Sequence, residues 1–138
     1  MDQQQVLDAL AGLTLFSDLD RPQLQAVAHT MAEESFPVDQ RILRQGFSGS
    51  GFFIILEGEV TVRVDGEAVA TLGKGDFFGE ISLLLGEPPI ADVVATTPVK
   101  ALQLGGPDLR EFLLAYPAVM YRMLQAVSRR LDRANRRG

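Results

Sequence analysis

The sequence predicts a mainly β domain with flanking helices (α+β), in which a double-stranded β-helix or jelly-roll-like β-roll lies between helical ends. Three observations support this fold class. From residue 33 to 104, short β-rich runs alternate with glycine-centred turns. Before and after this region, apolar residues recur at helical spacing. The 138 residues have the usual length of one domain, so we expect one unit over residues 1–138.

Residues 1–32 are expected to form two helices. In the first, Val6, Leu7 and Leu10 share one face, and Gly12 ends the pattern as a C-terminal glycine would. Before the second, the run 17–22 offers capping side chains and a proline near the first turn. Leu24 then begins an apolar face, which predicts a helix over about 21–31.

Residues 33–104 are expected to form the β-roll, with seven or eight strands. The tight turn Asp65-Gly66 predicts a hairpin, because both central residues tolerate positive φ. The glycine-rich stretch Gly46–Gly51 predicts a flexible connection. The strand candidates are Ser35–Val38, Ile42–Gln45, Phe52–Glu57, Val60–Asp65, Ala68–Leu72, Ala91–Ala95 and Val99–Leu104.

Residues 107–137 are expected to form two C-terminal helices. One starts at Pro107-Asp108 and runs to about Ala115, and the other starts at Pro117 and runs to about Arg136. The second helix carries one apolar stripe at alternating spacings of 4 and 3, which favours pairing with a second copy in a homodimer. The dimer-helix residues are Met120, Leu124, Val127 and Leu131, with Ala134 continuing the stripe.

The composition excludes several classes of function. No apolar run reaches the roughly 18 residues of a membrane span, and the polar start is unlike a signal peptide, so we expect a cytoplasmic protein. The absence of cysteine and the single His29 leave no metal cluster and no cofactor site of that kind. No nucleophile–base pair can be assembled, and we therefore expect no enzyme.

Charge is divided unevenly along the chain. Residues 1–121 carry 7 Lys/Arg and 17 Asp/Glu, whereas residues 122–138 carry 6 Arg and a single Asp. The acidic body would repel nucleic acid, because binding requires cations at the phosphates. Only the C-terminal helix could attract it, and a basic tail is most often a solvated helix end, so a nucleic-acid partner is not expected.

One segment interrupts the β pattern and is the main candidate for a binding site. Glu80 to Leu85 reads as one or two helical turns, whose first amides lack helical partners and so favour an anion. Gly79 would let a ligand approach the backbone, and the Glu80 carboxylate would accept hydrogen bonds from hydroxyl groups. A sugar phosphate fits both features. The alternative is purely structural: Gly79 turns the chain and Glu80 caps the helix.

At these residues the sequence resembles the cyclic nucleotide-binding domain family, which includes the catabolite activator protein and the regulatory subunit of cyclic-AMP-dependent protein kinase. The stretch from Gly75 to Leu84 looks like the family's phosphate-binding cassette, here about 75–91. Gln45-Gly46, Phe53–Leu56 and Glu57–Val60 match in the expected order. The resemblance implies a non-catalytic sensor domain that binds cyclic AMP or cyclic GMP. The implied ligand-binding residues are Gly79, Glu80, Ile81, Ser82, Pro89, Ile90 and Ala91.

The chain departs from the family pattern at the phosphate side of the cassette. Pro89 stands where the family has a phosphate-binding arginine, and Ile90 stands where a hydroxyl is expected. Proline supplies neither charge nor amide donor. A hydrogen bond to a charged group contributes roughly 1.5–3 kcal/mol, and leaving a buried charge unpaired costs about 3–5 kcal/mol. Affinity for an anionic nucleotide should therefore fall by on the order of tenfold to a thousandfold or more.

This departure leaves three interpretations open. In the first, the pocket binds no nucleotide and serves as a packing or interaction module. In the second, it binds a nucleotide weakly, with the free amides of the cassette and a remote arginine such as Arg122 replacing part of the charge. In the third, it holds a less anionic ligand against Pro89 and Ile90. An alternative function is a working cyclic AMP/GMP module of a catabolite activator-type regulator that lacks its DNA-binding domain. In each case the terminal helices would relay the signal to a protein partner or a second copy.

Overall fold

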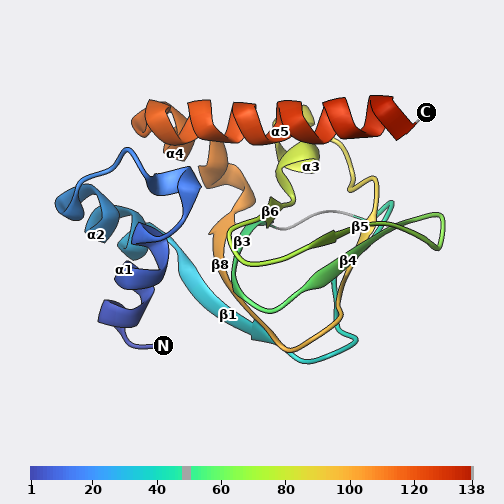
Figure 1. Cartoon of the computed structure of the whole chain (residues 1–138), viewed down its shortest axis with the longest axis horizontal. Helices are drawn as coiled ribbons and strands as arrows, with labels where there is room; N and C mark the ends of the chain where they lie inside the picture. Colours follow the sequence, from blue (N-terminus) through green and yellow to red (C-terminus); the bar gives the residue numbers. More distant parts are fainter. Residues whose placement is uncertain (48–50, 138) are drawn as a thin grey trace.

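The structure is a computed structural model that describes residues 1–47 and 51–137. Part of the predicted connection Gly46–Gly51 and all of Gly138 therefore lie outside the described residues. Two four-stranded antiparallel sheets form the roll, in the orders β1-β8-β3-β6 and β2-β7-β4-β5 (Figure 1). The strands are β1 (Ala32–Phe36), β2 (Arg41–Leu43), β3 (Gly51–Glu57), β4 (Val60–Val64), β5 (Glu67–Leu72), β6 (Phe77–Phe78), β7 (Asp92–Ala95) and β8 (Val99–Gly105).

Helices precede and follow the roll in the sequence, as predicted, and pack against it. Figure 1 shows α1 and α2 beside β1, and α5 running across the molecule above α3. Both N-terminal helices begin with a capping box, at Asp2 and Asp20. The helices of the described residues are α1 (Gln3–Ala11), α2 (Arg21–Thr30), α3 (Glu80–Leu85), α4 (Leu109–Ala115) and α5 (Pro117–Arg137), and the 3₁₀ turns are η1 (Thr14–Phe16) and η2 (Gly106–Asp108).

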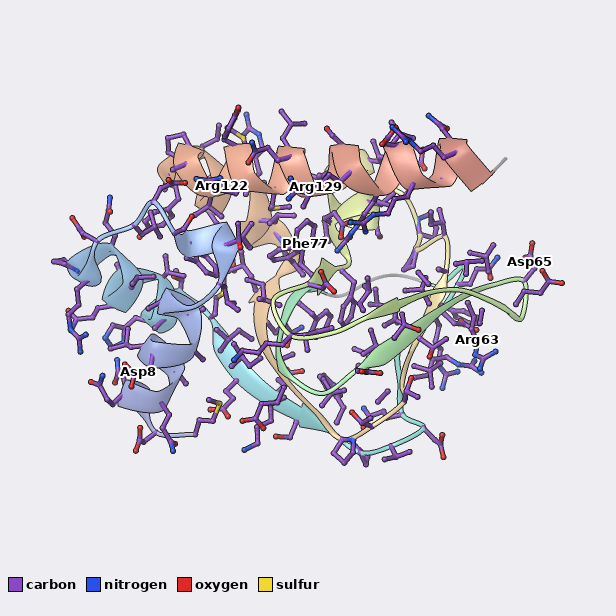
Figure 2. The ribbon with its side chains drawn as sticks, viewed as in Figure 1. Asp8, Arg63, Asp65, Phe77, Arg122 and Arg129 are labelled. Atoms are coloured by element: carbon purple, nitrogen blue, oxygen red, sulfur yellow. The ribbon has the colours of Figure 1, made fainter. Side chains whose placement is uncertain are left out.

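Most predicted elements are confirmed, with differences at their ends. The hairpin between β4 and β5 has positive φ at both turn residues, 52° at Asp65 and 83° at Gly66, and Asp65 lies at its tip in Figure 2. The first strand begins and ends earlier than predicted: β1 covers Ala32–Phe36 and not Ser35–Val38. It ends before Pro37, because proline has no amide to continue the ladder. Gly12 ends α1 with an ordinary φ of −82° rather than a left-handed one.

Two hydrophobic clusters meet on the two faces of β3, which explains its continuous apolar run. Phe52, Ile54 and Leu56 pack against the helices, while Phe53 and Ile55 face the second sheet. Helix α5 joins the first cluster through Val119 and Met123, so its first half is fixed to the body. Among the described residues, no helix is both long enough and apolar enough to span a bilayer.

Candidate ligand-binding site

A cavity of about 520 Å³ opens between the second sheet, α3 and α5. Its volume lies in the range of small-molecule sites, which is roughly 300–1,000 Å³. The strand walls are apolar, and α5 closes one side with Val127, Arg130, Leu131 and Ala134. The structure brings all the sequence-predicted ligand residues to this one cavity: Gly79, Glu80, Ile81, Ser82, Pro89, Ile90 and Ala91.

Gly79 places the helix that carries Glu80. It has a φ of 93° and is the N-cap residue of α3, directly after β6. A Cβ atom at this position would overlap the carbonyl oxygen of Gly51 in the neighbouring strand. Only glycine combines this backbone conformation with so close an approach, so the turn delivers Glu80 into the cavity wall.

Glu80 is a buried carboxylate with one free oxygen. Its side chain is 5% exposed, and Oε1 lies 3.2 Å from Nη1 of Arg130. Oε2 is buried and has no hydrogen-bond partner among the described residues. Burial raises the pKa of Glu80, while a hydrogen bond from its own backbone amide and the charge of Arg130 act in the opposite direction. The site therefore holds an acceptor that is not yet satisfied.

Arg130 is the charged cavity-lining residue that the sequence analysis missed. Besides the Glu80 contact, its Nη2 donates to the carbonyl oxygen of Phe77 at 2.7 Å, and its guanidinium lies 4.3 Å from the centroid of the Phe77 ring. These contacts fix α5 to the cassette from 50 residues away in the sequence. One signal was present: Arg130 lies three residues after Val127 and four before Ala134, which places it on the apolar face of the helix.

The expectation that Arg122 supplies the missing charge is wrong. Arg122 donates twice to Asp18, with Nε to Oδ2 at 2.8 Å and Nη2 to Oδ1 at 3.1 Å, and it does not line the cavity of Glu80. This hydrogen-bonded pair lowers the pKa of Asp18. The cavity nevertheless contains a guanidinium, that of Arg130, so a cavity without any cation is also ruled out.

The remaining cassette residues supply shape and no charge. The Ser82 hydroxyl donates to the carbonyl oxygen of Glu87, so it is engaged within the loop. Pro89 is buried, and its carbonyl oxygen accepts from the Gly46 amide at 2.9 Å. Ile90 is 54% exposed. The position where an arginine was expected is therefore an apolar wall.

The stripe predicted to form a dimer is divided between two environments. Val127 and Leu131 line the cavity, although Leu131 is also 60% exposed, whereas Met120 and Leu124 lie outside the cavity and are 40% and 61% exposed. The homodimer remains a prediction. Elsewhere, His29 contacts Gln3 at the surface, and the described residues contain no group of three His, Cys, Asp or Glu placed to hold a metal ion.

Comparison with known proteins gives a consistent answer. The family model described as "Cyclic nucleotide-binding domain" matches residues 33–116. The chain is 34% identical over 100 residues to the cGMP-dependent protein kinase egl-4 of Caenorhabditis briggsae; the match covers 68% of this chain but only 13% of the kinase.

Two solved structures of regulatory subunits of cAMP-independent protein kinase A are similar as well. One, from Trypanosoma brucei, is a triple mutant bound to cAMP in its A site; it has 30% identity and a TM-score of 0.77, over 89% of this chain and 46% of that one. The other, from Trypanosoma cruzi, is bound to guanosine; it has 28% identity and a TM-score of 0.75, over 91% of this chain and 46% of that one.

Proposed function

The chain belongs to the cyclic nucleotide-binding domain family, and from this premise we propose that it is a non-catalytic sensor module that binds a ribose-containing ligand on Glu80. We further propose that its affinity for cyclic nucleotides is weak or lost, because Pro89 replaces the cassette arginine. Its surroundings would be cytoplasmic, and its output would pass through the terminal helices to a protein partner.

The observation that carries this proposal is the free oxygen of Glu80. A buried acceptor without a partner costs about 1–3 kcal/mol, and it is retained at the wall of a cavity large enough for a nucleoside. A ligand hydroxyl group that donates to Oε2 would recover that cost. The same donation explains why the wall carries a carboxylate among apolar neighbours.

The charge balance of the cavity favours a ligand with little negative charge. Arg130 is the single cation among the described cavity-lining residues, and Glu80 already neutralises it. A cyclic phosphate would have to compete with Glu80 for this guanidinium or lie against Pro89 without a counterion. An uncharged nucleoside carries no phosphate and meets neither difficulty. A family member with guanosine bound, the Trypanosoma cruzi regulatory subunit, supports this choice of ligand.

The alternative function is a working cyclic AMP/GMP module of a catabolite activator-type regulator. The observation in its favour is the Arg130 guanidinium, which lines the cavity and could turn from Glu80 to a phosphate. Arginine recognises phosphate through paired hydrogen bonds, and its charge would then replace that of the missing cassette arginine.

Calorimetric titration with guanosine, cyclic AMP and cyclic GMP distinguishes the two functions. We expect guanosine to bind at least as tightly as either cyclic nucleotide. The variant Pro89→Arg/Ile90→Ser should bind cyclic AMP at least about tenfold more tightly than the unmodified chain. Pro88→Arg is the matched control, because Pro88 is exposed and lies outside the cavity. Submicromolar cyclic AMP binding by the unmodified chain would favour the alternative.

The proposed homodimer would use the exposed part of the α5 stripe. Met120 and Leu124 lie one helical turn apart on α5, and both are exposed. Sedimentation of the full chain should give a dimer, and Leu124→Glu should give a monomer of unchanged helicity. A monomeric unmodified chain at high micromolar concentration would contradict the proposal.

A further inference from the structure

The polar side chains of the Glu80 cavity all lie together at its α3 end. Glu80 and Ser82 belong to α3 itself, and the Arg130 guanidinium lies 3.2 Å from Glu80. Every other described residue of the lining is apolar or glycine. The strands and α5 supply most of these apolar walls, among them Val62, Val64, Leu72, Val127, Leu131 and Ala134. A ligand whose ribose lies on Glu80 therefore has its remaining part against apolar side chains.

The sheet itself uses the main-chain hydrogen-bonding groups of the strand walls. β4 pairs with β5 along one edge and with β7 along the other, and β7 in turn pairs with β2. The amides and carbonyls in these ladders point along the sheet, while the side chains stand out from it. A nucleoside base on this wall would therefore meet methyl and methylene groups instead of donors and acceptors.

Three apolar side chains line the cavity and also reach solvent, and we call them the rim. Ile81, Ile90 and Leu131 are 39%, 54% and 60% exposed. Removing apolar surface from water stabilises a complex roughly in proportion to the area that is covered. A ligand with an apolar group at the rim would cover these side chains, whereas a polar group there would not gain from them.

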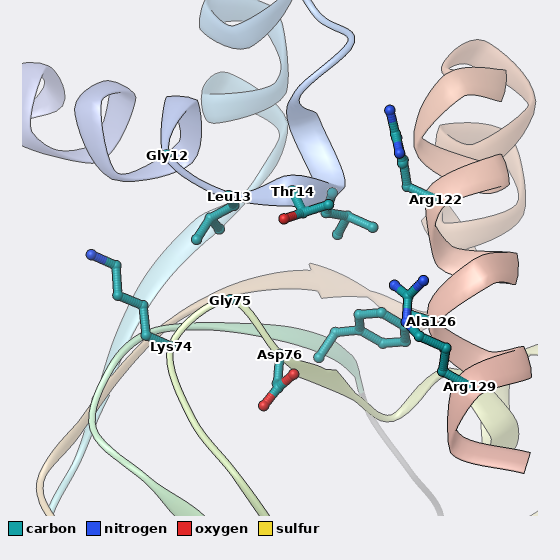
Figure 3. A pocket seen from close by; sticks show the side chains of 11 residues that line it. Gly12, Leu13, Thr14, Lys74, Gly75, Asp76, Arg122, Ala126 and Arg129 are labelled. Carbon is teal, nitrogen blue, oxygen red and sulfur yellow. The ribbon is translucent and has the colours of Figure 1, made fainter. Parts of the chain in front are cut away.

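A second cleft, of about 340 Å³, has a lining of a different kind. It shares no lining residue with the cavity of Glu80. Figure 3 shows its charged side chains, which are Lys74, Asp76, Arg122 and Arg129 (Figure 3). A polar base would find donors and acceptors in this second cleft. The walls of the Glu80 cavity offer none beyond the group at α3.

We propose that the Glu80 cavity selects ribonucleosides with an apolar base edge over guanosine and adenosine; this specificity rests on the proposed function, in which the ribose binds Glu80. The exocyclic groups of guanine and adenine lose their water on entry and find no side-chain partner on the described walls. A purine without an exocyclic group avoids that loss, and an aryl group at its 6-position covers the rim. Ile90 and Leu131 are then specificity residues.

Calorimetric titration of the full chain with guanosine, adenosine, purine riboside and 6-phenylpurine riboside tests this preference. We expect 6-phenylpurine riboside to bind about tenfold to a hundredfold more tightly than guanosine, with purine riboside between them. Ile90→Ser and Leu131→Gln should each lower that preference by about threefold to tenfold, because each removes apolar surface from the rim. Leu84→Ser is the matched control and should keep the preference. Leu84 is 55% exposed, much like Ile90, but it does not line the cavity.

Failure of the preference and failure of the proposed function give different results. If no nucleoside binds, or if Glu80→Gln binds each of them as tightly as the unmodified chain, the proposed function is wrong and the specificity with it. If guanosine binds and 6-phenylpurine riboside binds no more tightly, the function stands and the apolar preference is wrong. A preference that persists unchanged in both Ile90→Ser and Leu131→Gln would place the aryl group away from the rim and would also overturn the proposal.

Discussion

The guanidinium of Arg130 joins the side chain of Glu80 to the main chain of Phe77. One nitrogen lies 3.2 Å from the Glu80 carboxylate, another donates to the Phe77 carbonyl at 2.7 Å, and the group covers the Phe77 ring. Glu80 is therefore both the acceptor available to a ligand and the attachment point of α5. A ligand on Glu80 would act on the residue that holds the last helix, which is the physical basis of the proposed output through that helix.

Loss of this arginine should destabilise the fold. A buried pair that loses one partner costs about 3–5 kcal/mol, and because the Arg130 side chain is 29% exposed we expect Arg130→Gln to cost about 2–3 kcal/mol. In a Glu80→Gln background the same change should cost only about 1 kcal/mol, since no buried charge is left behind. Urea denaturation of the four proteins measures the difference.

Arg133→Gln is the control for that cycle. Arg133 is exposed on the same helix, so its substitution should change the free energy of unfolding by less than about 0.5 kcal/mol. Equal costs of Arg130→Gln in the two backgrounds would show that the ion pair with Glu80 contributes nothing.

Stability should depend on pH through Glu80, with a definite sign. The pKa of Glu80 is raised above its usual 4.5 chiefly by burial, so the folded chain keeps this proton at a pH where the unfolded chain has released it. Its contribution is fully present below pH 4.5 and is lost as pH rises through the raised pKa. The free energy of unfolding of the unmodified chain minus that of Glu80→Gln should therefore fall as pH rises from 4.5 through the raised pKa.

The pH dependence of stability that Asp18 causes has the opposite sign and must be separated from that of Glu80. Its pKa is lowered from 3.8 by the hydrogen bond from Arg122, so its contribution is present above that value and is lost as pH falls through the lowered pKa. Both proteins contain Asp18, and its effect cancels in their difference. A difference that does not vary with pH between 4 and 8 would contradict the burial of an ionisable Glu80.

The two glycines that flank α3 should respond differently to alanine. Both have positive φ, 93° at Gly79 and 67° at Gly86, which costs about 1–2 kcal/mol for a side chain. At Gly86 nothing lies within 4 Å of an added Cβ, whereas at Gly79 the Cβ would overlap the Gly51 carbonyl. Gly79→Ala should therefore lower stability by at least about 2 kcal/mol more than Gly86→Ala in denaturant titrations. Equal effects would show that the close approach is not maintained.

The sequence was informative where a local pattern decides the structure. The Asp65-Gly66 hairpin and the cassette are contiguous, so their residue types report directly on turn geometry and on which side chains share a cavity. The edge strand β1 and the two-residue β6 were harder, because β1 buries little and β6 is too short for a period to appear.

Arg130 could not be identified as a site residue in the same way. Its partners are Glu80 and Phe77, and only the packing of α5 across the roll brings these groups together. One-dimensional charge counting placed Arg130 with the other arginines of a solvated helix end. The sequence analysis instead named Arg122, whose partner in the structure is Asp18.

The attachment of α5 through Arg130 predicts a local opening that is separate from global unfolding. Beyond Val127, the last turns of α5 are mostly exposed, and Arg130 supplies their polar contacts with the cassette. Without these contacts, opening of this segment becomes easier by about 1–3 kcal/mol, so amide hydrogen exchange of residues 128–136 in Arg130→Gln should quicken by roughly tenfold to a hundredfold. The amides of β3 and β8, which are buried in the sheet core, should exchange more slowly or more quickly only in step with global stability.

The variant Glu80→Gln is a graded control. It keeps a neutral acceptor for Arg130 and should give a smaller increase in the exchange rate of residues 128–136. If residues 128–136 already exchange at the rate of an unprotected chain in the unmodified protein, the contact between Arg130 and the cassette does not restrain the helix, and the proposed route from cavity to helix is wrong.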